Sequence, residues 1–129
     1  MSQNYGPKRF ISINAATADE TLGKPAFSPG YALQTWVVQG DGVTSSGVIT
    51  FEEASWGPTV AGVPAQDYTG TWSVITTVNA SDVNTGSASG SAQKFVHISA
   101  TANAYSRPRI STIIGGGGTI SVFLHQEGQ

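Results

Sequence analysis

The sequence of 129 residues contains no cysteine, so the chain has neither disulfide bonds nor thiolate metal ligands. Charged residues are also scarce, at 11% of the chain against about 25% in typical soluble domains. No apolar run approaches the ~20 residues of a membrane-spanning helix, and the first ten residues lack the apolar segment of a secretory signal. We therefore expect a protein that is made in a cytoplasm and held together by packing, hydrogen bonds or assembly.

The low charge also excludes some partners. The formal net charge is −2 and no basic run occurs, which argues against binding to nucleic acid or to an anionic membrane. The apolar fraction of 39% separates the sequence from disordered chains, and the length fits a single domain. A surface with so few charges suits a protein that neighbouring molecules partly cover.

After residue 30 the chain consists of short segments rich in β-branched and aromatic residues, separated by glycine-rich or polar turns. These segments span residues 31–39, 46–55, 70–80, 93–101, 104–114 and 118–126. No window shows the 3.6-residue apolar period of a helix. The pattern predicts an all-β fold, a jelly-roll-like antiparallel β-sandwich, over residues 31–129.

Residues 1–30 differ from the rest, because Pro7, Pro25 and Pro29 interrupt any long element. We expect one short strand at residues 9–15 within an otherwise irregular N-terminal arm. The arm would wrap its own sandwich or a neighbouring molecule. Together with a long loop at residues 56–69, it is the predicted place of partner contacts.

Glycine-rich turns predict two hairpins, one from the strands at 31–39 and 46–55 and one from those at 104–114 and 118–126. Pro108 lacks a backbone donor, which predicts an edge position or a bulge for its strand. Several strands carry apolar residues on both faces, as expected when one face packs in the core and the other against a partner. The predicted core contains Leu33, Val37, Ile49, Phe51, Trp72, Val74, Val96, Ile98, Ile110, Ile120, Val122 and Leu124.

Five motifs stand in an order that resembles small virion proteins of tailed bacteriophages. They are Val38-Gln39-Gly40, Ser46-Gly47-Val48-Ile49-Thr50-Phe51-Glu52, Gly70-Thr71-Trp72-Ser73-Val74, Tyr105-Ser106-Arg107-Pro108-Arg109-Ile110 and the segment from Gly115 to Leu124. The resemblance covers residues 31–126. It departs at Pro108, where the family usually has valine, and after Phe51, where the family more often has a Ser-x-Asp-Gly turn.

The resemblance implies a structural protein of the virion, made in the host cytoplasm. Such proteins resemble capsid decoration, head or tail components, often arranged in trimers or other rings. Because the chain is short and lacks tail-tube or fibre repeats, we expect a capsid decoration (cement) protein that forms a homotrimer and binds the capsid lattice. Its partners would be further copies of itself and the major capsid protein or another virion protein. We expect a protein that works by shape and burial, with no cofactor, no metal and no catalytic activity.

Eight residues are candidates for partner contacts, because they lie in the arm, in the long loop or on the arginine-bearing strand. They are Tyr5, Arg9, Phe10, Phe27, Trp56, Tyr68, Arg107 and Arg109. The last two fall on one side of their strand. There they can bind a carboxylate across an interface, or pair within the chain with Glu52 or Asp67.

A carbohydrate- or receptor-binding module of a phage tail is the main alternative. Exposed aromatic rings form the platforms of many sugar sites, and Trp56 and Tyr68 lie in the long loop, where exposure is expected. The competing interpretation is that such rings cap the core or fill an interface, where aromatic residues are also enriched.

Catalytic and metal sites have less support in the sequence. Glu52 and Glu53 point to opposite faces of a strand, so a glycosidase pair would need Asp41 or Asp67 as the second carboxylate. Two histidines, at positions 97 and 125, would need a nearby carboxylate to hold a metal ion, and no short-spaced ligand motif contains them.

Overall fold

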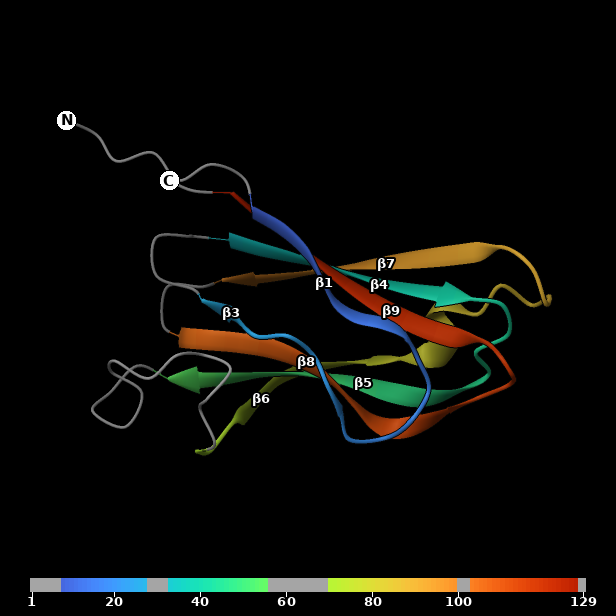
Figure 1. Ribbon diagram of the computed structural model, residues 1–129, viewed down its shortest axis with the longest axis horizontal. Coiled ribbons are helices and arrows are strands. Elements are labelled where there is room, and N and C mark those ends of the chain that lie inside the picture. The colour runs from blue at the N-terminus through green and yellow to red at the C-terminus, as the bar shows by residue number, and fades with distance from the viewer. Residues whose placement is uncertain (1–7, 28–32, 56–69, 100–102, 128–129) are drawn as a thin grey trace.

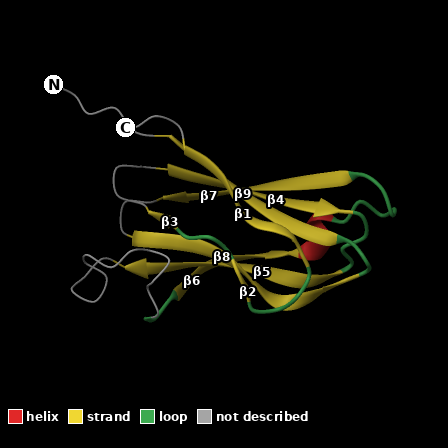
Figure 2. Ribbon diagram, viewed as in Figure 1, coloured by secondary structure: helices red, strands yellow, loops and turns green. Residues whose placement is uncertain are grey.

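The computed structural model describes residues 8–27, 33–55, 70–99 and 103–127. These residues form two antiparallel sheets packed face to face, with a short 3₁₀ helix at one end (Figures 1 and 2). The elements are β1 (Lys8–Ala16), β2 (Thr21–Leu22), β3 (Ala26–Phe27), β4 (Leu33–Asp41), β5 (Ser46–Ser55), β6 (Ser73–Asn79), η2 (Ala80–Val83), β7 (Ser91–Ser99), β8 (Asn103–Gly115) and β9 (Thr119–Glu127). The predicted all-β sandwich is confirmed.

The strand order is that of a jelly roll. Sheet A has the order β1-β9-β4-β7, and sheet B has the order β2-β8-β5-β6, with β3 also paired to β8. If β2 and β3 count as one interrupted strand, the first strand pairs with the last and the second with the second to last. The series continues inward to the pair of β5 with β6. Such nested antiparallel pairing wraps the chain into a double-sheet jelly roll.

Residues 8–27, which belong to the predicted N-terminal arm, contribute strands to both sheets. β1 pairs with β9 in sheet A, from Lys8 opposite Gln126 to Ala16 opposite Ile120. β2 and β3 pair with β8 in sheet B. β1 is the strand expected at residues 9–15, and Pro25 lies between β2 and β3 at the edge of sheet B, where an interruption is tolerated. The remaining residues of the predicted arm lie outside the described ranges.

Neither predicted hairpin forms. β4 and β5 lie in different sheets, and so do β8 and β9, so the turns between them carry the chain across the sandwich. Gly116 adopts a φ of 108°, which residues with a side chain rarely adopt. The two crossing turns are joined by backbone hydrogen bonds, from Ser45 N–H to Gly115 O (2.9 Å) and from Gly118 N–H to Val43 O (2.7 Å).

Pro108 lies inside sheet B, between β5 and the short strands β2 and β3, and not at an edge. The neighbouring strand is interrupted beside it, because β2 ends at Leu22 and β3 begins at Ala26. Gly23 lies in this gap and donates its N–H to the Pro108 carbonyl oxygen (2.8 Å). A break in the ladder therefore accommodates a residue that has no donor of its own.

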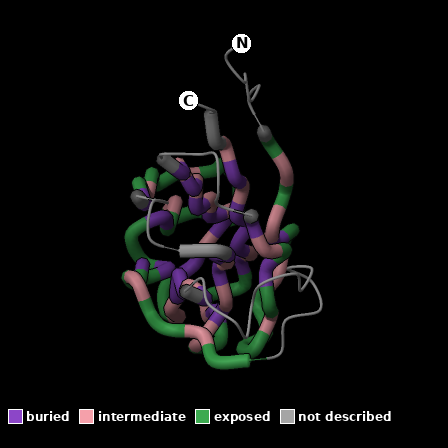
Figure 3. The backbone as a smooth tube through the Cα atoms, turned by 90° about the vertical axis from the view of Figure 1, so that its left-hand side faces the viewer, coloured by how far each residue is buried: buried purple, intermediate pink, exposed green. Residues whose placement is uncertain are grey.

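The core lies between the two sheets, as the purple segments of Figure 3 show. Its buried members are Ile13, Ala26, Trp36, Val38, Ile49, Phe51, Val78, Ala80, Val83, Ile98, Ile110, Ile114, Ile120, Val122 and Leu124. Most of the predicted core residues whose side chains are described belong to it or pack against it.

β4 presents the opposite face to the one predicted. Trp36 and Val38 are fully buried, whereas Val37 points to the outer face of sheet A. The Trp36 ring packs against Phe51 and Phe10, with ring centroids 5.7 Å and 6.4 Å away. Because burial of apolar area drives the choice of face, the strand turns its largest side chain inward.

Candidate functional site

The outer face of sheet A, which points away from sheet B, is organised in rows. β1, β9, β4 and β7 pair so that side chains of neighbouring strands line up across the sheet. Four rows result: a basic row (Arg9, His125, Thr35, His97), an apolar row (Ile11, Phe123, Val37, Phe95), an amide row (Ser121, Gln39, Gln93) and a carboxylate row (Thr119, Asp41, Ser91).

The apolar row crosses all four strands of sheet A. Ile11 opposes Phe123, Phe123 opposes Val37, and Val37 opposes Phe95. The two ends of the row are exposed, Ile11 by 55% and Phe95 by 58%, and the two middle residues are half-buried. Exposed apolar residues gathered on one face are typical of surfaces that contact other molecules.

Polar rows flank the apolar row on both sides. On one side, Thr35 Oγ1 and His97 Nδ1 lie 3.1 Å apart and share a hydrogen bond. His97 and His125 stand on the same row, separated by β4. The described part of the chain holds no group of three or more histidines and carboxylates placed to bind a metal ion.

On the other side, four side chains form a continuous hydrogen-bonded chain. Gln93 Nε2 donates to Gln39 Oε1 (2.9 Å), and Gln39 Nε2 donates to Asp41 Oδ1 (3.0 Å). Ser91 Oγ donates to the same Asp41 oxygen (2.5 Å). These bonds span β4 and β7 and fix the polar end of the outer face.

A shallow hollow of about 500 Å³ lies over β1 and β9. It is lined by Arg9, Phe10, Ile11, Phe123, Leu124 and His125. Phe10 also closes the core beneath, with its ring edge-on to Trp36 and with Lys24 Nζ 4.8 Å from its centroid. Basic groups beside an apolar floor suit a partner segment that carries both an apolar and an acidic side chain.

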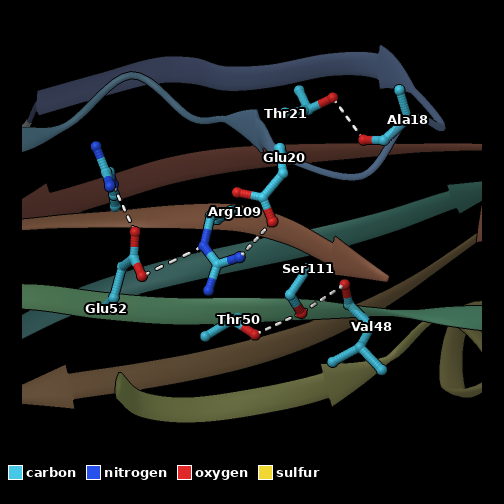
Figure 4. A network of polar contacts seen from close by, with 9 residues as sticks. Ala18, Glu20, Thr21, Val48, Thr50, Glu52, Arg109 and Ser111 are labelled. Carbon is cyan, nitrogen blue, oxygen red and sulfur yellow. Dashed lines mark hydrogen bonds and ion pairs between the residues drawn. The ribbon is translucent and has the colours of Figure 1, made fainter. Parts of the chain in front are cut away.

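On the outer face of sheet B, two arginines and two carboxylates form an ion-pair network (Figure 4). Arg107 Nε donates to one oxygen of Glu52 (2.7 Å), and Arg109 Nε donates to the other (3.4 Å). Arg109 Nη1 also donates to Glu20 (2.9 Å). The Glu52 side chain is only 5% exposed, so two guanidinium groups neutralise a carboxylate that is almost removed from water. The intrachain pairing with Glu52 is thus confirmed.

Trp72 covers part of this network and does not belong to the core. The guanidinium carbon of Arg107 lies 4.0 Å from the centroid of the Trp72 ring, a cation–π contact. The predicted core residue Val74 is likewise 61% exposed on β6. For Val74 the cause is the register shift between Phe51 and Glu52, which places Val74 opposite the outward-facing Glu52 while Ile75 packs against the core.

The structure locates part of the predicted contact set. Arg9 is exposed on the basic row, and Phe10 is half-buried against the core. Phe27 lies in β3, where its backbone opposes Tyr105. Three further candidates, Tyr5, Trp56 and Tyr68, lie outside the described residues. The role of these residues in partner binding stays a prediction.

Sequence reasoning missed the apolar row itself. Ile11, Phe123, Val37 and Phe95 were not among the candidate contact residues, although strands with apolar residues on both faces were recognised. The sequence signal that could have revealed the row was that these strands carry apolar residues on both of their faces. The row became a surface only when the register placed four such residues side by side.

The carboxylates considered for a hydrolase do not converge. Glu52 lies on the outer face of sheet B and is held by Arg107, whereas Asp41 lies on the outer face of sheet A. Glu53 opposes Ser73 on the next strand, and Asp67 is outside the described residues.

Among the helices of the described ranges, none has the length and apolar character needed to cross a membrane.

No protein-family model matches the sequence, and no curated protein sequence is significantly similar to it. The fold is similar to that of a solved structure, the SPBc2 prophage-derived protein YomS, with a TM-score of 0.55 and 12% sequence identity. The aligned region covers 93% of this chain and 91% of that protein. The similarity therefore extends over nearly the full length of both chains and concerns their fold.

Proposed function

We propose that this chain is a bacteriophage structural protein that acts in the virion, as a decoration protein bound to the capsid lattice. Two independent observations support the proposal. The ordered motifs of residues 31–126 resemble small virion proteins, and the fold is similar to that of a prophage-derived protein. The proposed partners are the major capsid protein, or another virion protein, and further copies of the chain.

The apolar row of sheet A is the observation that carries the proposal. It offers a rigid surface made of sheet residues, and its polar flanks fix the orientation of a partner. A protein of this kind acts by shape and burial, so we propose that it has no catalytic turnover. The hollow at β1 and β9 is the proposed lattice contact, because it combines the exposed Ile11 with the basic Arg9.

Replacement Ile11→Lys tests this contact. The variant places an ammonium group in the apolar part of the hollow, so binding to empty capsids of the encoding phage should weaken by roughly tenfold or more. Co-sedimentation over a range of protein concentrations measures the affinity. Mass spectrometry of purified particles should also find the native chain.

Leu22→Lys is the matched control, because Leu22 is 54% exposed and lies in sheet B, away from the hollow. Its affinity for capsids should equal that of the native protein. Absence of the chain from purified particles contradicts the virion assignment. Equal losses in the two variants contradict the proposed contact.

A tail module that binds a carbohydrate or a receptor is the second candidate. The hollow favours it, since an apolar floor with a nearby arginine and histidine is a common arrangement for small polar ligands. A glycan array with the purified protein separates the two functions. Saturable binding to one glycan class, lost in Phe123→Ala, supports the tail module and contradicts capsid decoration.

A further inference from the structure

Sheet A ends at β7, on the side opposite the hollow over β1 and β9. β7 is the last strand of sheet A and, within the described residues, pairs only with β4. All nine residues from Ser91 to Ser99 pair with β4 without a register shift. A long regular edge strand presents a row of backbone donors and acceptors to another strand.

The other described edges are short or irregular. β1 has two register shifts against β9, and β6 has one against β5. β2 and β3 contain two residues each. Proteins commonly protect their edges by such irregularities, by charged residues and by proline. β7 contains no proline, and its one charged side chain, Lys94, is held by Asp82 of η2 at 3.0 Å.

We propose that β7 pairs with β7 of a second copy of this chain, antiparallel and around a two-fold axis. This pairing would join the sheet A of each copy, with four strands apiece, into one continuous eight-stranded sheet. Pairing of a strand with itself is self-complementary only in the antiparallel direction, which is the direction of every pair in the fold. The inference rests on strand geometry and is independent of the proposed lattice contact.

The register of this pairing follows from the strand itself. Residues that oppose one another across a two-fold axis must share a face of the sheet, so the axis passes through a residue position. Phe95 is the middle residue of the nine, and only an axis at Phe95 pairs the whole strand. Phe95 would then oppose Phe95 of the second copy.

Side-chain chemistry favours the same register. The apolar row ends at Phe95, so the row of one copy would continue directly into the row of the other. Phe95 is 58% exposed in the single chain, and cross-strand aromatic pairs stabilise antiparallel sheets. Lys94 would oppose Val96, and Gln93 would oppose His97, so no two like charges meet.

The first test measures mass. Light scattering of the native protein over a dilution series should give about twice the 13.3 kDa of one chain. Phe95→Lys places two ammonium groups opposite each other and should raise the dimer dissociation constant roughly tenfold or more. Val74→Lys is the control, because Val74 is exposed on β6, the edge strand of the other sheet, and this variant should remain a dimer.

The second test measures the register. Because the native sequence contains no cysteine, any disulfide must form through the introduced residue. Opposed positions lie about 5 Å apart, so Phe95→Cys should form an intermolecular disulfide on mild oxidation. His97→Cys should not, because positions 97 of the two copies would be about 13 Å apart along the strand.

The results of these two tests decide the proposed pairing and leave the proposed function to its own test. A monomer at all concentrations overturns the pairing, and so does a trimer, the state that the resemblance to virion proteins implies. A dimer that Phe95→Lys leaves intact, or that cross-links through position 97 and not 95, also overturns it. None of these outcomes affects capsid binding by the hollow, which Ile11→Lys measures separately.

Discussion

Replacing Glu52 by glutamine is expected to lower the free energy of unfolding by about 2–3 kcal/mol. The change removes the negative charge that two arginines share while keeping the shape of the side chain. Arg107 and Arg109 are only 15% and 22% exposed, so water compensates poorly for the lost carboxylate. Removing one partner of a buried ion pair costs more than the pair contributes net, because a charge remains without its counter-ion.

Chemical denaturation of both proteins measures this effect. The midpoint should shift at an unchanged dependence on denaturant, since the surface exposed on unfolding stays the same. Glu20→Gln is the matched control: it removes the other carboxylate bound to Arg109, but Glu20 is 69% exposed. Its effect should stay within about 1 kcal/mol. Equal destabilisation of the two variants would show that burial of Glu52 does not govern the network.

Replacing Gly40 by alanine should destabilise the fold by about 2–3 kcal/mol. Gly40 lies in β4, opposite Ala92 and Ile120, where η2 packs against the sheet. A methyl group there would collide with the carbonyl oxygen of Val83 and would lie 2.8 Å from its Cγ2 atom. Val83 is fully buried and cannot move without opening this end of the sandwich.

Thermal and chemical unfolding of Gly40→Ala measure the cost of this collision. Gly86→Ala is a control for the backbone effect alone, since Gly86 has a φ of 77° and no atom within 4 Å of an added methyl group. It should cost about 1 kcal/mol, the ordinary penalty of left-handed backbone for alanine. If Gly40→Ala were no worse than Gly86→Ala, η2 would not be held tightly against β4.

The ion-pair network shows which contacts the local sequence pattern could predict and which it could not. Alternation along residues 104–114 placed Arg107 and Arg109 on one side of a strand, and the structure agrees. Glu52 was one of two intrachain partners considered, and it is the one observed. Glu20 was not considered, because its neighbour relation to Arg109 depends on β2 pairing with β8, nearly ninety residues away.

The apolar row shows the opposite case. Each of its four residues was visible as an apolar position, but the row exists only because three strand pairs align in register. Sequence reasoning also chose the wrong face of β4. The strand is apolar on both faces, and only packing against sheet B decided that Trp36, and not Val37, would point inward.

The sequence by itself determined the fold class and the approximate positions of most strands, because alternation with a period of two and turn-forming residues are local properties. Tertiary structure decided the partners of each strand. A glycine-rich turn looks the same whether it closes a hairpin or carries the chain to the other sheet, and both predicted hairpins proved to be such crossings. Which strands lie side by side is set by contacts between residues far apart in the chain, and these bring the apolar row and the open edge of β7 together on one face.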